Sequence, residues 1–251
     1  MSTTNVLERP DPIPDGPDYA DQVLADLDAL ELVSCDGEPM ESDWHRKNIN
    51  LLVDQVQYLF RGRSDFYVGG NMFIYFSREQ AKNRDFRGPD FFFVSRTHRH
   101  PMRPFWAVWD EGLRLPDVVI ELASPTTIDE DRGVKFEVYR DVLRVANYFI
   151  YDPESKLLDG WQLERNRYVP LKPSADGRIR CDELDAWLGP WEGEYVGDQT
   201  TWLRFFQSNG AVLPVAVEAE KQRADATEAE NGRLRLMLAQ LQTGSANGAT
   251  H

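Results

Sequence analysis

The sequence predicts an α/β protein, with a mixed α+β sheet whose core follows the order helix, three strands, helix, strand, and with a long C-terminal helix. Three observations support this fold class. Short aromatic and β-branched runs are bounded by Gly and Pro, which is typical of strands. Apolar residues recur at helical spacing before the first strands and again before the last one. A helical stretch between two strands is typical of a crossover connection within one sheet.

The first expected elements are a helix and a strand. Apolar residues recur at helical spacing over 44–60, and either Ser42 or Asp43 can cap this helix. A glycine pair at 69–70 then interrupts the chain before an apolar strand at 71–76. The helix is expected to cover one face of the sheet.

The rest of the core is expected from four further segments. Strands are predicted at 90–94 and 118–122, a helix over 131–143, and a last strand at 147–151. Residues 105–115 could add a minor hairpin, and short strands and turns should follow the last core strand.

Three regions are expected along the chain. Residues 1–43 form an acidic arm with a helix near 19–32, residues 44–213 form the folded domain, and residues 214–251 form a helical tail. The acidity is concentrated at the N-terminal end, because residues 1–44 hold twelve acidic residues and one basic residue. The net charge of the chain is −14.

The tail is expected to form one long helix over 214–242. Leu234, Leu238 and Leu241 fall at spacings of four and three, which is the pattern of a coiled-coil seam. Such a seam would allow a homodimer, but it covers too few heptads to require pairing.

The composition excludes several classes of protein. No apolar run approaches about eighteen residues, so no membrane span is expected. Residues 1–17 are polar and lack a signal-peptide core. Cys35 and Cys181 form neither a zinc pattern nor a disulfide framework. No Walker loop, dinucleotide fingerprint or Ser/His/Asp signature is present. We therefore expect a cytoplasmic protein.

Two predicted strands each carry an acidic residue. Asp90 begins the strand that reads DFFFV, and Glu121 lies inside the run VVIEL. Burying a carboxylate is costly unless a cation or a hydrogen-bond donor compensates it. Because Mg²⁺ often takes only one or two protein carboxylates, Asp90 and Glu121 are predicted to hold Mg²⁺, or Mn²⁺ in its place.

Lys135, on the following helix, is the predicted third member of the site. It could orient a nucleophile or neutralise the charge that develops during phosphodiester hydrolysis. Each residue also has a plainer interpretation. Asp90 could be a turn acid at the start of a strand, Glu121 could form a buried ion pair with Lys135, and Lys135 could be an ordinary surface lysine.

A set of short motifs over roughly 35–190 resembles a known family. These motifs are Pro89-Asp90, the segment PDVVIELASPT at 116–126, then Asp131, Lys135 and Tyr139, and the segment YFIYDP at 148–153. They resemble the bacterial Uma-type endonucleases of the PD-(D/E)xK superfamily, whose restriction-endonuclease-like core has the same order of elements. The resemblance implies Mg²⁺-dependent nuclease activity, with Asp90 and Glu121 as the metal-binding acids and residues 44–213 as the catalytic domain.

The chain departs from the superfamily pattern at one position. The lysine expected two residues after the second acid is replaced by Ala123, and the resemblance implies that Lys135 takes its place. Tyr139 lies four residues after Lys135 on the same helix and could support it. His45 could either assist the site or only flank it.

The charge distribution leaves two interpretations of a basic segment. Residues 78–103 are basic, and this segment either forms a solvated loop or a rim that faces phosphate groups. Its basic residues and histidines are Arg78, Lys82, Arg84, Arg87, Arg96, His98, Arg99, His100 and Arg103.

The sequence thus predicts a Mg²⁺-dependent endonuclease that acts on DNA. RNA or a free nucleotide is an alternative substrate. A second hypothesis, from another class, is a catalytically silent interaction module that keeps the fold and assembles through its C-terminal helix.

Overall fold

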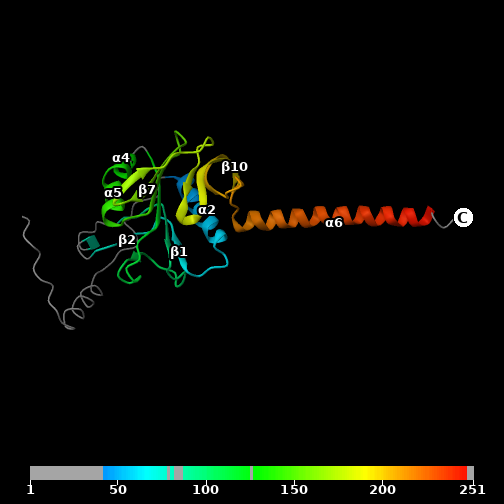
Figure 1. The fold of residues 1–251 in the computed structure, drawn as a ribbon, viewed down its shortest axis with the longest axis horizontal. Helices are drawn as coiled ribbons and strands as arrows, with labels where there is room; N and C mark the ends of the chain where they lie inside the picture. Colours follow the sequence, from blue (N-terminus) through cyan, green and yellow to red (C-terminus); the bar gives the residue numbers. More distant parts are fainter. Residues whose placement is uncertain (1–41, 78–79, 82–86, 125–126, 248–251) are drawn as a thin grey trace, which may run out of the picture.

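The structure, a computed structural model, describes residues 42–77, 80–81, 87–124 and 127–247, with side chains described as far as residue 238. Within these residues the chain forms a body of three sheets and several helices, from which the helix α6 projects (Figure 1). The predicted acidic arm and its helix near 19–32 lie outside the described residues, except at Ser42 and Asp43.

The main sheet confirms the predicted fold class. Its strands lie in the order β1, β3, β5, β6, β7, β8. Their bounds are β1 Phe66–Gly69, β3 Phe91–Ser95, β5 Val118–Leu122, β6 Asn147–Asp152, β7 Leu157–Glu164 and β8 Arg167–Pro170. β5 and β6 pair in parallel, whereas the other neighbouring strands pair antiparallel. Along the chain, one helix comes first, and it is followed by three strands of this sheet, a helical crossover and a further strand of the same sheet.

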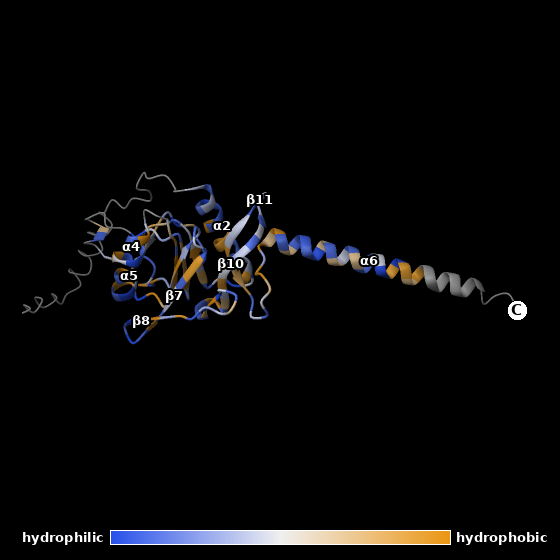
Figure 2. Ribbon diagram, turned by 90° about the horizontal axis from the view of Figure 1, so that it is seen from above, coloured by the Kyte–Doolittle hydropathy of each residue, from blue (hydrophilic) through white to orange (hydrophobic). Residues whose placement is uncertain are grey.

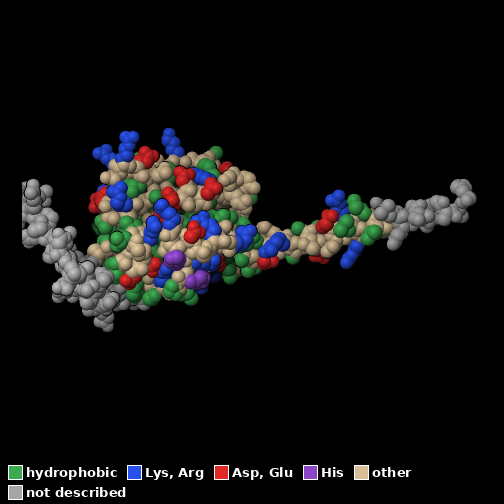
Figure 3. Space-filling model, turned by 60° about the horizontal axis from the view of Figure 1, so that its bottom comes forward, with side chains coloured by type: hydrophobic (Ala, Val, Ile, Leu, Met, Phe, Trp, Pro, Cys, Tyr) green, Lys and Arg blue, Asp and Glu red, His purple; other side chains and the backbone are tan. Residues whose placement is uncertain are grey.

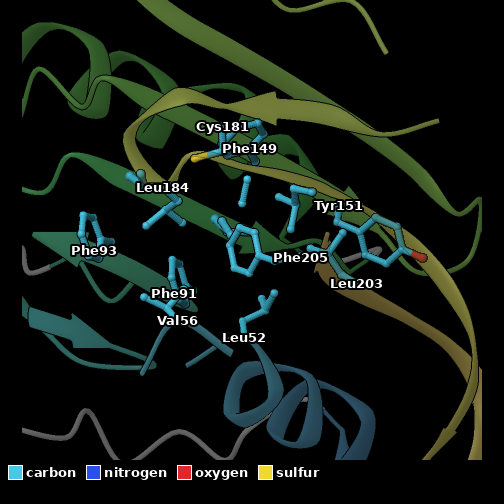
Figure 4. Packing of buried hydrophobic residues seen from close by; sticks show 14 of the residues in the cluster. Leu52, Val56, Phe91, Phe93, Phe149, Tyr151, Cys181, Leu184, Leu203 and Phe205 are labelled. Atoms are coloured by element: carbon cyan, nitrogen blue, oxygen red, sulfur yellow. The ribbon is translucent and has the colours of Figure 1, made fainter. Parts of the chain in front are cut away.

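The helix α2 (Asp43–Leu59) covers one face of this sheet. Of the two caps predicted, Ser42 is the N-cap, and its hydroxyl oxygen accepts a hydrogen bond from the backbone N–H of His45 at 3.2 Å. The buried residues Leu52 and Val56 of α2 pack against Phe91 and other residues of the main sheet (Figure 4). The helical spacing of these apolar residues in the sequence therefore identified the packed face correctly.

The predicted position of the first strand was wrong. The strand that joins the main sheet is β1, which ends at Gly69, and residues 71–76 contribute only β2 (Ile74–Tyr75). The glycine was interpreted as a strand breaker, but it is the last paired residue of β1, opposite Phe92. A Cβ atom on Gly69 would lie 2.6 Å from the Phe92 ring, so the sheet has no room for a side chain there.

The minor hairpin expected in 105–115 was also wrong. β4 (Trp106–Ala107) pairs in parallel with β2 and not with the residues that follow it. Gly112 and Leu113 both have positive φ angles, 60° in each case, and they turn the chain away after β4. Strand β4 therefore belongs to a small separate sheet with β2.

The predicted helix over 131–143 is divided into three segments. These are α4 (Ile128–Arg132), α5 (Val134–Glu137) and the π-helical turn η1 (Val138–Val142). The interruption occurs at Gly133, where a Cβ atom would lie 2.8 Å from the backbone oxygen of Asp129. The crossover covers the face of the main sheet opposite α2, and Tyr139 and Leu143 pack there against Val119 and Ile150.

A second sheet closes the α2 side of the body. It contains β9 (Ile179–Cys181), β10 (Ala186–Tyr195) and β11 (Asp198–Phe206) in antiparallel order, with the 3₁₀ turn η2 (Asp182–Leu184) after β9. Two buried side-chain amides of α2 form hydrogen bonds with backbone groups at the unpaired edge of β11. Asn48 exchanges two hydrogen bonds with the backbone of Leu203, and Gln55 accepts one from Phe205 N. They satisfy backbone groups that an edge strand leaves unpaired.

The helix α6 (Ala216–Asn247) confirms the predicted long C-terminal helix. Its root is fixed by Glu218, which receives two hydrogen bonds from the buried guanidinium of Arg204, at 2.9 and 2.6 Å. Beyond this root the described side chains of α6 are exposed, and Figure 2 shows a largely hydrophilic helix with an apolar stretch further out. None of the described helices is both long enough and apolar enough to cross a membrane.

Candidate active site

The alternation of the strands places Asp90 and Glu121 on one face of the main sheet. Phe92, Val119 and Ala123 all pack in the core beneath the crossover. Because every second residue of a strand faces the same side, Asp90 lies on the face of Phe92, and Glu121 lies on the face of Val119 and Ala123. Both acids therefore face α4, α5 and η1.

Glu121 is buried and is contacted from the crossover. Its side chain is 2% exposed. The hydroxyl of Tyr139 donates a hydrogen bond to Oε1 at 2.8 Å, and Nζ of Lys135 lies 3.4 Å from the same oxygen. The π-helical turn carries Tyr139 at this contact, and such turns are frequent at functional sites.

Asp90 lies beside Glu121 at the adjoining end of β3. Its Oδ2 accepts a hydrogen bond from the backbone N–H of Leu122 at 2.7 Å, and its own backbone nitrogen lies 3.5 Å from Oε2 of Glu121. The Asp90 side chain is half-buried, whereas Glu121 is enclosed. The two acids thus occupy one corner of the sheet, with Asp90 on its more open side.

A third acid, Asp131, shares the lysine. Oδ1 of Asp131 lies 2.8 Å from Nζ of Lys135, which is closer than the lysine approaches Glu121. The Asp131 side chain is 1% exposed, and the hydroxyl of Tyr148 donates a hydrogen bond to the Asp131 backbone oxygen at 2.9 Å. Lys135 is therefore held between carboxylates from β5 and from α4.

The electrostatics of this cluster follow from burial. Desolvation raises the pKa of Glu121 to about 8, although Lys135 opposes the shift and Asp90 adds to it. Burial likewise raises the pKa of Asp131. Desolvation alone would lower the pKa of Lys135, but Glu121 and Asp131 outweigh it and the pKa of Lys135 lies above its ordinary value. Lys135 is therefore a fixed positive charge, and Glu121 is the group that titrates near neutral pH.

His45 reaches the same corner from the first turn of α2. Its Nε2 lies 2.7 Å from the backbone oxygen of Leu122, and its Nδ1 lies 3.0 Å from the Ser42 hydroxyl. A carbonyl oxygen can only accept, so Nε2 carries a proton and donates it. His45 therefore contacts the backbone next to Glu121 from the helix on the opposite face of the sheet, and both interpretations of His45, as a residue that assists the site or only flanks it, stay predictions.

The donor set suits a hard divalent cation. With all groups ionised, three carboxylates and one lysine give the cluster a formal charge of −2, and a bound cation would offset both this charge and the burial that raises the pKa of Glu121. Among the described residues no three His, Cys, Asp or Glu side chains are grouped closely enough to hold a metal ion by themselves. Asp90 and Glu121 would have to be supplemented by backbone oxygens or water, as is usual for Mg²⁺.

The basic segment after β3 does not surround Asp90. Arg96 follows the other end of β3, six residues of extended chain or roughly 20 Å away from Asp90. Arg99 lines a groove of about 710 Å³ beside the root of α6, together with Arg61, which lies just after α2. Figure 3 shows histidine and basic side chains on this part of the body. Arg78, Lys82 and Arg84 lie outside the described residues.

The structure brings together every site residue named from the sequence, and it adds Asp131 as a partner of the lysine. Asp131 entered the sequence interpretation only as part of a motif. Its spacing of four residues before Lys135 was the available signal, because residues i and i+4 of a helix are neighbours. The catalytic and metal-binding roles of Asp90, Glu121 and Lys135 stay predictions.

This arrangement, with a helix, three strands, a helical crossover and a strand, and with acids on two strands beside a crossover lysine, defines the class of restriction-endonuclease-like folds. The comparison with protein families agrees. The Uma2 family, described as "Putative restriction endonuclease", matches residues 17–191, so the chain belongs to this family.

A crystal structure of a putative nuclease belonging to DUF820, from Anabaena variabilis, is similar over 60% of this chain and 81% of that one, with 13% sequence identity and a TM-score of 0.43. No curated protein matches the chain significantly.

Proposed function

We propose that the protein is a divalent-metal-dependent endonuclease that hydrolyses phosphodiester bonds of DNA. The observation that carries this proposal is the convergence of Asp90, Glu121 and Lys135 at one corner of the sheet, with Nζ of Lys135 3.4 Å from Glu121. Membership of a restriction endonuclease family supports DNA as the substrate.

Asp90 and Glu121 would hold Mg²⁺ or Mn²⁺ at this corner. When bound, such a cation would supply positive charge to the scissile phosphate and would acidify a water molecule. Asp90 is the more exposed of the two acids, so a phosphate group would approach the cation from the side of Asp90.

The chain's own residues would position the charges. Lys135 keeps its proton because two carboxylates face it, so its role is to stabilise negative charge and not to accept a proton. Asp131 fixes the ammonium group of Lys135, and Tyr139 orients Oε1 of Glu121. These contacts hold the site before the substrate binds.

The test combines metal titration with cleavage. Calorimetric titration of the wild type with Mg²⁺ or Mn²⁺ should show binding that Glu121→Gln removes, and nicking of a plasmid should disappear in the same variant. The matched control is Asp117→Asn, which changes an acid at the other end of β5 and should retain both properties. Cleavage retained by Glu121→Gln would refute the assignment.

One observation favours the second candidate function, a catalytically silent interaction module. Lys135 already compensates Glu121 and Asp131, so the buried ion pairs could serve the fold alone. The absence of metal binding by a well-folded wild-type chain would support this function. Binding without nicking would instead direct the search to RNA or nucleotide substrates.

A further inference from the structure

We propose that α6 pairs with α6 of a second copy of this chain as a parallel, in-register two-stranded coiled coil. The proposal is independent of the cleavage chemistry, because it rests on residues of α6 and on the groove at its root.

The first support is that the side chains of α6 described between residues 220 and 238 are all exposed. Leu234 and Leu238 are 47% and 59% exposed, although leucine is normally buried. An isolated helix in water is marginally stable, and Gly232 in the middle of this one weakens it further. A second helix against the exposed leucines would supply the missing burial.

The second support is the heptad register. With Val217, Ala224, Asn231 and Leu238 at the a positions, Glu220, Thr227, Leu234 and Leu241 fall at the d positions, so the leucines of the seam lie at its outer end. A single asparagine at an a position is a known determinant of register and of the two-stranded state. In a parallel pair, Asn231 of one helix faces Asn231 of the other and can bond it.

The third support is the charge on both sides of this seam. In a parallel coiled coil, each g residue faces the e residue five positions later on the other helix. Here Arg223 at g would face Glu228 at e, and Glu230 at g would face Arg235 at e. Both pairs are attractive, and each occurs twice in a symmetric dimer.

The fourth support is the direction of the seam relative to the body. Ala219 is buried and marks the side of α6 that contacts the body. At about 100° per residue, the nearest d positions lie roughly a quarter of a turn from Ala219 and the nearest a positions roughly two fifths of a turn, so the seam is turned away from this contact. The lining of the groove of about 710 Å³ includes Val217 of the seam and also Val196, which are 78% and 69% exposed. A second helix can therefore begin its contact at the root of α6.

The ion pairs that these charged residues form within one helix do not compete strongly with the proposed pairs between two helices. Within one helix Arg223 pairs with Glu220, and Arg233 lies 3.7 Å from Glu230. Both pairs are exposed, and exposed pairs contribute little to stability. Their side chains are therefore free to reorient toward a partner helix.

The experiment is sedimentation analysis of the full chain and its charge variants over a range of concentrations. The wild type should be dimeric. Glu230→Arg, and separately Arg235→Glu, place like charges across the seam and should raise the dimer dissociation constant about tenfold. The double variant Glu230→Arg, Arg235→Glu should restore pairing.

The control and the orientation test use the same helix. Asp225→Arg makes the same charge change at a b position outside the seam and should leave the dimer unchanged. In a Cys35→Ser background, Asn231→Cys should form an intermolecular disulfide under oxidising conditions. A wild type that stays monomeric at its highest soluble concentration, or charge variants that associate like the wild type, would overturn the proposal.

Failure of this proposal is separable from failure of the nuclease assignment. Glu121→Gln, which should abolish cleavage, should sediment like the wild type, because Glu121 lies in the body and does not contact α6.

Discussion

Asp117 and Glu121, near opposite ends of β5, differ in almost every respect except charge. Asp117 lies before the strand, is half-buried, and accepts a hydrogen bond from the backbone N–H of Ser95 at 2.6 Å. Glu121 lies inside the strand, is enclosed, and meets a lysine and a tyrosine. Asp117 thus links the start of β5 to the end of β3 by a hydrogen bond, whereas Glu121 lies in an environment that disfavours its ionised form. The contrast indicates that the surroundings of these two acids determine whether the carboxylate serves as a hydrogen-bond acceptor or becomes a group whose charge is disfavoured.

The largest expected effect is that of removing the buried cation. Lys135→Met leaves Glu121 and Asp131 without their shared counter-charge, and breaking a buried pair costs about 3–5 kcal/mol. This loss in the free energy of unfolding, measured by urea denaturation, should be smaller at pH 5 than at pH 8. Both carboxylates can take up protons at the lower pH, so they then need the lysine less.

A matched control for this variant lies on the same crossover. Arg132 pairs with Asp159 at 2.5 Å, but both side chains are about half exposed. Arg132→Met should therefore cost no more than about 1 kcal/mol. Equal losses in the two variants would contradict the distinction between buried and exposed pairs.

The free energy of unfolding of the metal-free protein should depend on pH through Glu121. The pKa of Glu121 is about 8 in the folded protein and near its ordinary value of 4.5 in the unfolded chain. Between these values the folded state retains a proton that the unfolded state has lost, so this group lowers stability as the pH rises, by at most about 1.4 kcal/mol per pH unit.

Glu121→Gln isolates this contribution, because glutamine does not titrate. With EDTA present, the stability of the variant relative to the wild type should increase from pH 4.5 to 8 and then level off. A difference that stays constant over this range would show that burial does not shift the pKa of Glu121.

A smaller effect is expected at Tyr139. Tyr139→Phe removes the hydrogen bond to Glu121 and should cost about 1 kcal/mol in thermal or urea unfolding, with a further rise in the pKa of Glu121. Tyr168→Phe is the comparison, because the Tyr168 hydroxyl has no hydrogen-bond partner among the described residues. This second variant should unfold like the wild type.

The smallest effect is expected at the other end of β5. In Asp117→Asn the amide oxygen can still accept the hydrogen bond of Ser95, so the free energy of unfolding should change by less than about 1 kcal/mol. Plasmid nicking should be unchanged. A loss of nicking here would show that both ends of the strand contribute to the site.

The sequence predicted which residues of the candidate site lie together better than it predicted the first strand of the sheet. Glu121 was recognisable because an acid within a run of β-branched residues requires compensation, and the alternation of Asp90 with Phe92 placed it on the same face. Lys135 fell on the crossover that covers this face. Such regularities are local, so they can be identified before the fold is known.

Other features depend on contacts that are distant in sequence. Gly69 was misinterpreted because only the ring of Phe92, across the strand pair, explains why a glycine belongs inside β1. Asn48 and Gln55 resemble polar interruptions of an amphipathic helix until β11 lies beside them. The division of the crossover at Gly133 likewise follows from the close approach of the Asp129 oxygen.

The three charged residues of the candidate site come from separate elements, and this affects when the site can form during folding. Asp90 and Glu121 come with the strands, but Lys135 arrives only when the crossover docks on the sheet. A chain with a formed sheet and an undocked crossover would therefore lack the complete candidate site. For the proposed nuclease, cleavage recovered during refolding should lag behind β-sheet formation, so the activity would depend on the docking of this one layer.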